Sequence, residues 1–180
     1  IAVLGLGVTT PAAADELTFV STWEPANTST GSSNSNQVRL PLTSTGTYDF
    51  SVDWGDGTVE QITEYDQPEV THTYATEDSR TITITGTIDG FRFDNVGDRL
   101  KITDISSWGP LALGNSGGYF HGAENLTISA TDSPELADTT NLSNAFLGAT
   151  SLTGDFSQWD VSGVTNMRSM FEGATVFNAD

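Results

Sequence analysis

Hydrophobic and polar residues alternate with a period of two through much of the first half of the chain. Alternation of this kind predicts half-buried strands in antiparallel sheets. Asp56-Gly57, a strong hairpin-turn signal, lies directly after one of the alternating segments. Several short strands separated by turns predict a small β-sandwich over residues 15–98. The apolar positions form three runs: Val38, Leu40 and Leu42; Tyr48, Phe50, Val52 and Trp54; and Ile82, Ile84 and Ile88.

Two segments fall outside this alternation. Residues 27–36 contain no apolar side chain, which predicts a flexible loop. Residues 1–14 begin with an apolar run and continue through Pro11 to three alanines, as the back half of a secretory signal peptide does. The run is too short to span a bilayer. The alternative is an apolar N-terminal segment that pairs with a sheet edge in this chain or in a neighbouring copy.

The second half of the chain repeats the phrase Phe-x-Gly-Ala. Its copies begin at Phe120, Phe146 and Phe171, which are 26 (146 − 120) and 25 (171 − 146) residues apart. A period of roughly 20–29 residues is the signature of a leucine-rich-type solenoid, whose coils stack and share one core. Other residues keep the same register: Asn115, Asn141 and Asn166; Leu126, Leu152 and Phe177; and Trp108 and Trp159.

The last copy supplies an interpretation of a single coil. Val161, Val164, Met167 and Phe171 recur at helical spacing, which predicts a short amphipathic helix over 163–172 that ends at Gly173. We expect Leu152 and Phe156 in the strand part of the coil. The phenylalanines should be buried in one column, and so should Leu126 and Leu152. The asparagines are expected to form an internal ladder that satisfies backbone groups.

Composition limits the partners of the protein. The 180 residues include 24 acidic and 6 basic side chains, giving a formal net charge of −18, and no cysteine. Binding to nucleic acid or to an anionic membrane requires clustered Lys and Arg, so we expect neither partner. Without cysteine the fold uses no disulfides and no thiolate metal sites. A chain of this length accommodates two modest domains, divided between residues 98 and 99.

Few residues offer catalytic or metal-binding chemistry. His72 and His121 are isolated in the sequence, and Asp53-x-Gly55-Asp56-Gly57 lacks the spacing of an EF-hand loop. There is no cysteine nucleophile. We therefore expect no catalytic, cofactor-binding or metal-binding residues and no cofactor, with a weak structural calcium site among loop carboxylates as the alternative. The residues that bind a partner are not identifiable from the sequence. Trp54 and Trp159 are expected in the core.

Residues 52–58 (Val-Asp-Trp-Gly-Asp-Gly-Thr), followed by Thr-His-Thr-Tyr at 71–74 and by alternating threonines at 81–85, resemble the polycystic-kidney-disease (PKD) type domain. The resemblance implies an immunoglobulin-like β-sandwich used as an extracellular spacer or adhesion module. One departure is the segment 76–80, where the family usually has Pro-Gly-Thr-Tyr.

Residues 156–178 contain Trp-Asp-Val-Ser-Gly-Val-Thr-Asn-Met and, three residues further on, Met-Phe. This long phrase resembles the BspA-type leucine-rich repeat, also called the mycoplasma lipoprotein or DUF285 repeat. The resemblance implies a β/α solenoid over 99–180, with degenerate copies at 102–120 and 126–146. Because the last copy is incomplete, we expect further coils after residue 180. No catalytic residues belong to this family.

Together the resemblances imply a mainly β fold with short helices, in a non-enzymatic protein that is secreted or held at the cell surface. Its expected task is adhesion to, or recognition of, an external protein, glycan or cell, without membrane insertion of the mature chain. Two alternatives remain open. One is a subunit of an extracellular filament, assembled with copies of itself through the sandwich and the apolar N-terminal segment. The other is a binding module of a larger secreted hydrolase.

Overall fold

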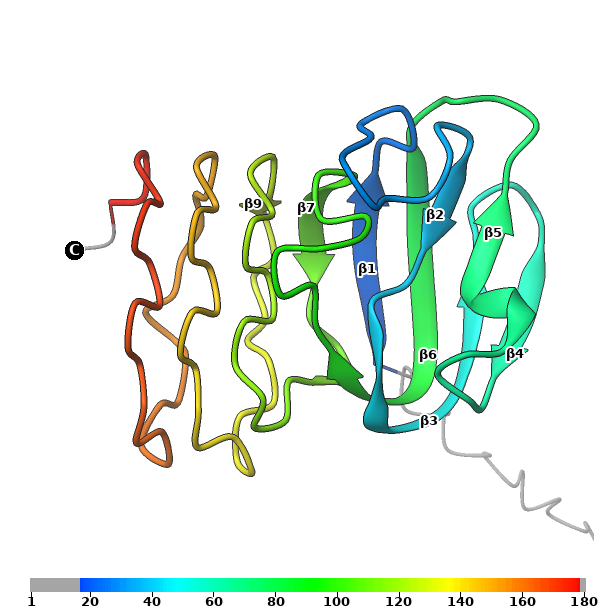
Figure 1. Ribbon diagram of the computed structural model, residues 1–180. Helices are drawn as coiled ribbons and strands as arrows, with labels where there is room; N and C mark the ends of the chain where they lie inside the picture. The colour runs from blue at the N-terminus through cyan, green and yellow to red at the C-terminus, as the bar shows by residue number, and fades with distance from the viewer. Residues whose placement is uncertain (1–16, 179–180) are drawn as a thin grey trace, which may run out of the picture.

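A computed structural model describes residues 17–178, which fold mainly as β-strands (Figure 1). One sheet has the strand order β4-β3-β6-β1-β7-β9, with β8 paired to β6, and a second sheet consists of β2 and β5. The only helix within residues 17–178 is η1, a single 3-10 turn at Pro68–Val70. The strands are β1 (Thr18–Trp23), β2 (Gln37–Arg39), β3 (Leu42–Asp53), β4 (Val59–Ile62), β5 (Thr71–Thr73), β6 (Arg80–Phe91), β7 (Ile102–Ser107), β8 (Leu111–Ala112) and β9 (Thr127–Ile128).

The alternation in the sequence correctly predicts the buried faces of the central strands. On β3, Tyr48, Phe50 and Val52 are buried, whereas Asp49 and Asp53 are exposed. The three isoleucines of β6 are buried as well, and so is Val38 on β2. Since successive side chains of a strand point to opposite faces, these residues together line one hydrophobic core shared by the two sheets.

The predicted hairpin at Asp56-Gly57 is also confirmed. Strands β3 and β4 pair from Asp53 opposite Val59, and the Trp54 amide donates to the Thr58 carbonyl over 3.0 Å. Gly55 has a positive φ of 76°, and a Cβ there would lie 2.3 Å from the carbonyl oxygen of Thr81. Glycine is required at that position because the backbones approach too closely for any side chain.

Strand β1 joins the two halves of the molecule. It pairs antiparallel with β6 on one side and with β7 on the other, so the main sheet continues across residue 98. Phe19, Ser21 and Trp23 on β1 are buried, and the Trp23 indole donates to the Ser21 hydroxyl over 2.8 Å. The first fourteen residues, including the predicted signal peptide, lie outside the described residues.

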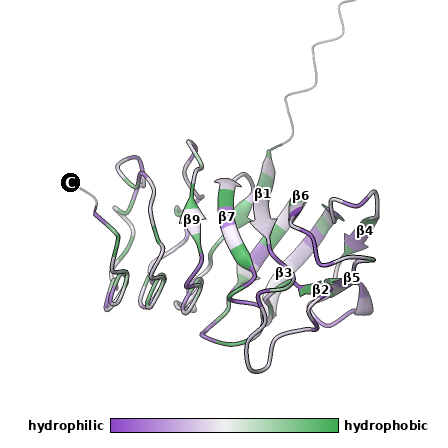
Figure 2. Cartoon of the chain, turned by 90° about the horizontal axis from the view of Figure 1, so that it is seen from above, coloured by the Kyte–Doolittle hydropathy of each residue, from purple (hydrophilic) through white to green (hydrophobic). Residues whose placement is uncertain are grey.

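Beyond β7 the chain winds into a row of stacked turns (Figure 1; Figure 2). We call residues 108–126 coil 1, residues 134–152 coil 2 and residues 159–177 coil 3. The Phe120 and Phe146 rings are parallel within 9° at a centroid distance of 5.4 Å, and the Phe146 and Phe171 rings within 3° at 5.7 Å. The predicted phenylalanine column is therefore confirmed, with Phe171 only half-buried. Leu126 and Leu152 are buried, as predicted.

The predicted helix at 163–172 is wrong. Backbone amides of coil 2 donate instead to carbonyls of coil 3, as in the 2.8 Å bond from Phe146 to Met170 and the 2.7 Å bond from Gly148 to Glu172. These bonds occupy carbonyls that a helix would bond internally. Ser169 has a φ of 53°, which also interrupts a helix, and Met167 is exposed rather than facing the core. The expected short helices, and hence a β/α coil, are absent from residues 17–178 apart from η1.

Two finer expectations for the coil also need correction. Leu152 and Phe156 are not in a strand, although the Ile128 amide donates to the Thr153 carbonyl over 2.9 Å. The asparagines do bond backbone groups, but they lie at the surface instead of inside. The side chains of Asn141 and Asn166 accept from the amides two residues ahead, over 3.0 and 3.1 Å, and so form Asx-turns.

Coil 2 lacks the tryptophan found in its two neighbours. Pro134, twelve residues before Phe146, takes the equivalent position and is buried. The rings of Trp108 and Trp159 meet edge to face at a centroid distance of 5.4 Å. Because proline is smaller than tryptophan, the tryptophans of coils 1 and 3 can contact each other at the position of Pro134. This contact explains why coil 2 fits the stack without a tryptophan of its own.

Candidate functional site

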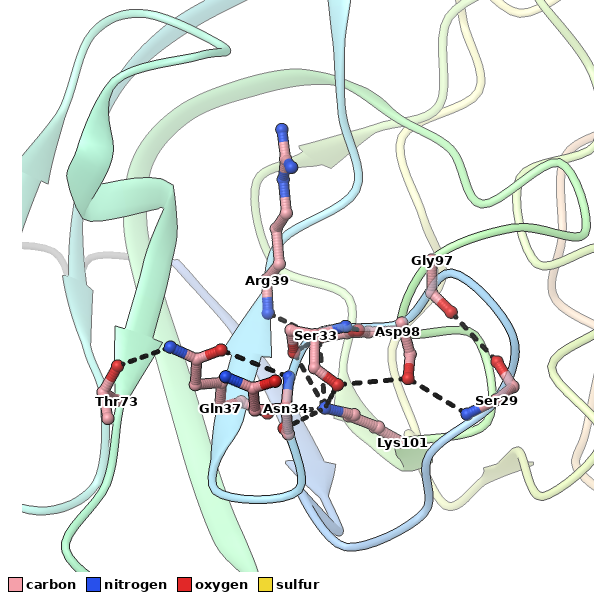
Figure 3. A network of polar contacts seen from close by, with 10 residues as sticks. Ser29, Ser33, Asn34, Gln37, Arg39, Thr73, Gly97, Asp98 and Lys101 are labelled. Atoms are coloured by element: carbon pink, nitrogen blue, oxygen red, sulfur yellow. Dashed lines mark hydrogen bonds and ion pairs between the residues drawn. The ribbon is translucent and has the colours of Figure 1, made fainter.

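The most highly connected polar group of the described residues is the Lys101 ammonium. Lys101 lies just before β7 and is buried, with its Nζ donating to the carbonyls of Ser33, Asn34 and Gln37 over 2.8–3.0 Å and to the Ser33 hydroxyl over 2.8 Å (Figure 3). Burial lowers the pKa of the Lys101 amine, and the nearby Asp98 carboxylate opposes that shift. This one side chain fixes the loop that the sequence predicts to be flexible.

Asp98 binds the same loop, and we call Lys101 and Asp98 together the Lys101 anchor. Its carboxylate accepts from the Ser33 amide over 2.7 Å, from the Ser33 hydroxyl over 2.6 Å and from the Arg39 amide over 2.6 Å. It also lies 3.7 Å from Lys101 Nζ, and both side chains are almost fully buried. The charges are compensated and hydrogen-bonded, which is what permits a buried ion pair.

Next to this anchor is a pocket of about 540 Å³. Its walls come from the loop around residues 31–33, from β2 and the segment up to Leu42, from Thr71 on β5 and from residues 92–98. The pocket therefore lies where the sheet-forming half of the chain meets the start of the stacked turns. Arg39 and Arg92 both line it, although neither was singled out by the sequence.

The stacked turns begin earlier than the repeated phrase indicates. The amides of Phe93, Asp94 and Asn95 donate to carbonyls of coil 1 over 2.9–3.0 Å, so residues 93–95 form a leading rung. The family model described as "Mycoplasma protein of unknown function, DUF285" matches residues 91–180. The chain belongs to the DUF285 family. No curated protein and no solved structure matches the chain.

The start of the DUF285 segment coincides with that leading rung. Arg92 lies directly before the rung. Its Nε donates to the Gly117 carbonyl over 2.8 Å, and its Nη2 pairs with Asp94 over 2.9 Å. The pocket is thus built partly from the first residues of the DUF285 segment and partly from the strands before it. Its residues are far apart in the sequence, so only the folded chain brings them together.

An aromatic cluster occupies the far side of the sheet-forming half. The His72 ring stacks on Trp54 at a centroid distance of 5.0 Å and contacts the edge of Tyr74 at 4.6 Å. The Tyr74 hydroxyl donates to the Trp54 carbonyl over 3.0 Å, and His72 Nε2 lies 2.9 Å from Asp56 Oδ2. Trp54 is buried, and so is Trp159, as predicted. His72 is therefore a packing residue of this cluster.

The other histidine has no metal-binding partners. His121 Nδ1 is buried without a hydrogen bond and lies 3.8 Å from an oxygen of Asp94. Across residues 17–178, no group of three or more His, Cys, Asp or Glu side chains is close enough to hold a metal ion. The same part of the chain contains no helix long and apolar enough to cross a membrane.

Acid is expected to weaken the protein partly through Asp56. Partial burial acts to raise the pKa of Asp56, but hydrogen bonds from His72 and Thr58 outweigh it and lower the pKa to about 2. A depressed folded-state pKa stabilises the fold above the unfolded value of about 3.9, and this contribution disappears as the pH falls through about 2. Urea midpoints of the native protein and of Asp56→Asn should therefore differ at pH 5 and converge by pH 2. A difference that stays constant over this range would contradict the assignment.

Proposed function

We propose that this protein is a non-enzymatic, exported surface protein that recognises an external partner. The observation that carries the proposal is the row of stacked turns, which extends the main sheet (Figure 1; Figure 2). Stacked-repeat proteins typically bind partners along such extended surfaces. Membership of the DUF285 repeat family supports the same function class.

The finer architecture is part of the proposal. We assign the sheet-forming half to a PKD-like β-sandwich, since the two halves of the motif pack against each other through Trp54, His72 and Tyr74. We assign the stacked turns to a BspA-type solenoid of strand-and-turn coils. In both roles the rigid scaffold positions an exposed surface, and neither role needs a catalytic group.

The surface chemistry favours a protein or glycan partner over a polyanion. With a formal net charge of −18, the chain repels nucleic acid and anionic lipid at long range. The exposed apolar residues include Val161 and Met167 on coil 3. Such side chains contribute contact area to a binding surface without requiring a charged partner.

A solid-phase binding assay tests this function. Beads coated with the full chain should bind saturably to at least one member of a panel of extracellular proteins, glycans or intact cells. An unrelated protein of similar net charge serves as the control. Met167→Ser on coil 3 should weaken binding, whereas Val59→Ser on β4 should not, although both residues are exposed. Absence of saturable binding across the panel would overturn the proposal.

A filament subunit is the second candidate function. Strand β4 is an edge strand of the main sheet, and an edge strand presents unpaired backbone groups with which a strand of a neighbouring copy can pair. A head-to-tail contact of this kind builds filaments when it does not close. Sedimentation velocity distinguishes the two functions: species that grow with protein concentration favour the filament, and a constant monomer favours recognition.

A further inference from the structure

The pocket beside the Lys101 anchor has a charge opposite to that of the molecule. The whole chain carries 24 acidic and 6 basic residues, yet the pocket lining includes two arginines and a single acidic residue, Asp98. The Asp98 carboxylate is already occupied by three hydrogen bonds and by Lys101. The Asp98 carboxylate is therefore already compensated. Arg92 is likewise paired with Asp94 over 2.9 Å, so Arg39 determines the charge that the pocket offers to a ligand.

The Arg39 guanidinium is free to bind. Its backbone amide donates to Asp98, but within residues 17–178 its side-chain nitrogens have neither a hydrogen bond nor an ion pair. Figure 3 shows this side chain pointing away from the Lys101 network. A guanidinium presents two parallel N–H groups that match a carboxylate, and a free one in a concave site favours such a ligand.

The remaining walls offer hydroxyl groups and apolar contact. Thr71 lies directly opposite Arg39 in the β2–β5 ladder, and its hydroxyl has no hydrogen-bond partner within the described residues. Val96, which is 64% exposed, adds an apolar surface to the lining, and Leu42 adds a half-buried one. A volume of about 540 Å³ is within the range of small-molecule sites.

We propose that this pocket binds the carboxylate of an acidic sugar, with the cationic Arg39 side chain as the main contact of that carboxylate. The carboxylate accepts from the Arg39 guanidinium, the Thr71 hydroxyl bonds a sugar hydroxyl, and Val96 covers a carbon face of the ring. Sugar binding at this pocket would be one form of the proposed recognition function. It rests on that function only in that the sugar comes from outside the cell. The pocket is lined by the start of the DUF285 segment and by the strands before it, so the ligand would also stabilise their junction.

Calorimetric titration of the full chain tests the site. Glucuronate is the probe, and glucose, which lacks the carboxylate, is its neutral counterpart. We expect glucuronate to bind at least about tenfold more tightly than glucose, as for a charge-assisted hydrogen-bond pair. Arg39→Met should weaken glucuronate binding at least about tenfold, and Thr71→Val should weaken it less. Within residues 17–178 the Arg39 side chain makes no hydrogen bond or ion pair, so this variant is expected to fold, and its thermal midpoint checks that it does.

Arg168→Met is the matched control, because it removes the same charge from an exposed site on coil 3, outside the pocket. It should change glucuronate binding by less than about twofold. Equal losses in the two arginine variants, equal binding of glucose and glucuronate, or equal binding of an N-acetylated aspartate amide would overturn the acidic-sugar assignment. If glucuronate fails to bind but beads coated with Arg39→Met still adhere, the pocket proposal alone is rejected. If glucuronate binds but the beads adhere to nothing, the proposed function alone is rejected.

Discussion

Replacing Lys101 with methionine is expected to lower the free energy of unfolding by about 3–5 kcal/mol, as for the loss of one partner of a buried ion pair. The substitution keeps an apolar side chain of similar length but removes the ammonium. It leaves the carbonyls of Ser33, Asn34 and Gln37 without their donor, and it leaves the Asp98 charge buried without a cation. Urea unfolding followed by circular dichroism measures the loss.

Two variants make this result interpretable. Arg168→Met removes an exposed cation and should change the free energy of unfolding by no more than about 0.5 kcal/mol. Adding Asp98→Asn to Lys101→Met should recover part of the stability, because no uncompensated charge then remains buried. A loss below about 1 kcal/mol in Lys101→Met would show that the loop does not depend on this anchor.

The sequence predicted the strands well because burial on one face imposes a period of two that is visible without any tertiary information. The hairpin at Asp56-Gly57 was equally local, since two adjacent residues determine the turn. The position of β1 was not predictable in this way. Its pairing with both β6 and β7 depends on which edges remain open after residues 80–107 have folded.

The helix was mispredicted for a specific reason. Val161, Val164 and Phe171 have helical spacing, but the backbone of coil 3 bonds to coil 2 rather than to itself. In a stack of coils, apolar residues recur wherever a side chain points into the shared core. A helical spacing of apolar residues is therefore not specific to a helix. The asparagines gave the better signal: Asn166 starts an Asx-turn, which is typical of a coil corner.

The candidate site was largely hidden in the sequence. Asp98 and Lys101 are three residues apart, but their partners lie more than fifty residues away on the loop at 33–39. Arg39 lies on β2 and Arg92 at the start of the DUF285 segment, and the two meet only in the pocket lining. The sequence did contain one signal. Because the acidic chain has only six basic residues, the position of each basic residue is more informative than usual.

Phe146→Ala is expected to destabilise the stacked turns by about 3–5 kcal/mol, as for truncation of a fully buried phenylalanine. Phe146 is the central ring of the column and stacks against Phe120 on one side and Phe171 on the other. Its removal deletes these two stacking contacts and the ring contacts with Phe156 and Trp159. It also leaves a cavity that neighbouring coils cannot close, since their backbones are fixed by inter-coil hydrogen bonds. Thermal or urea unfolding of the full chain measures the change.

Phe171→Ala is the comparison that separates stacking from simple loss of apolar area. Phe171 stacks on Phe146 and on Phe177, but its side chain is only half-buried, so we expect a smaller loss than at Phe146. This order is expected because each coil depends mainly on its neighbours, and among the described residues Phe146 has a stacked ring from a coil on either side. Equal losses at the two positions would mean that area alone determines stability. A loss at Phe146 below about 1 kcal/mol would contradict the column as the core of the repeat.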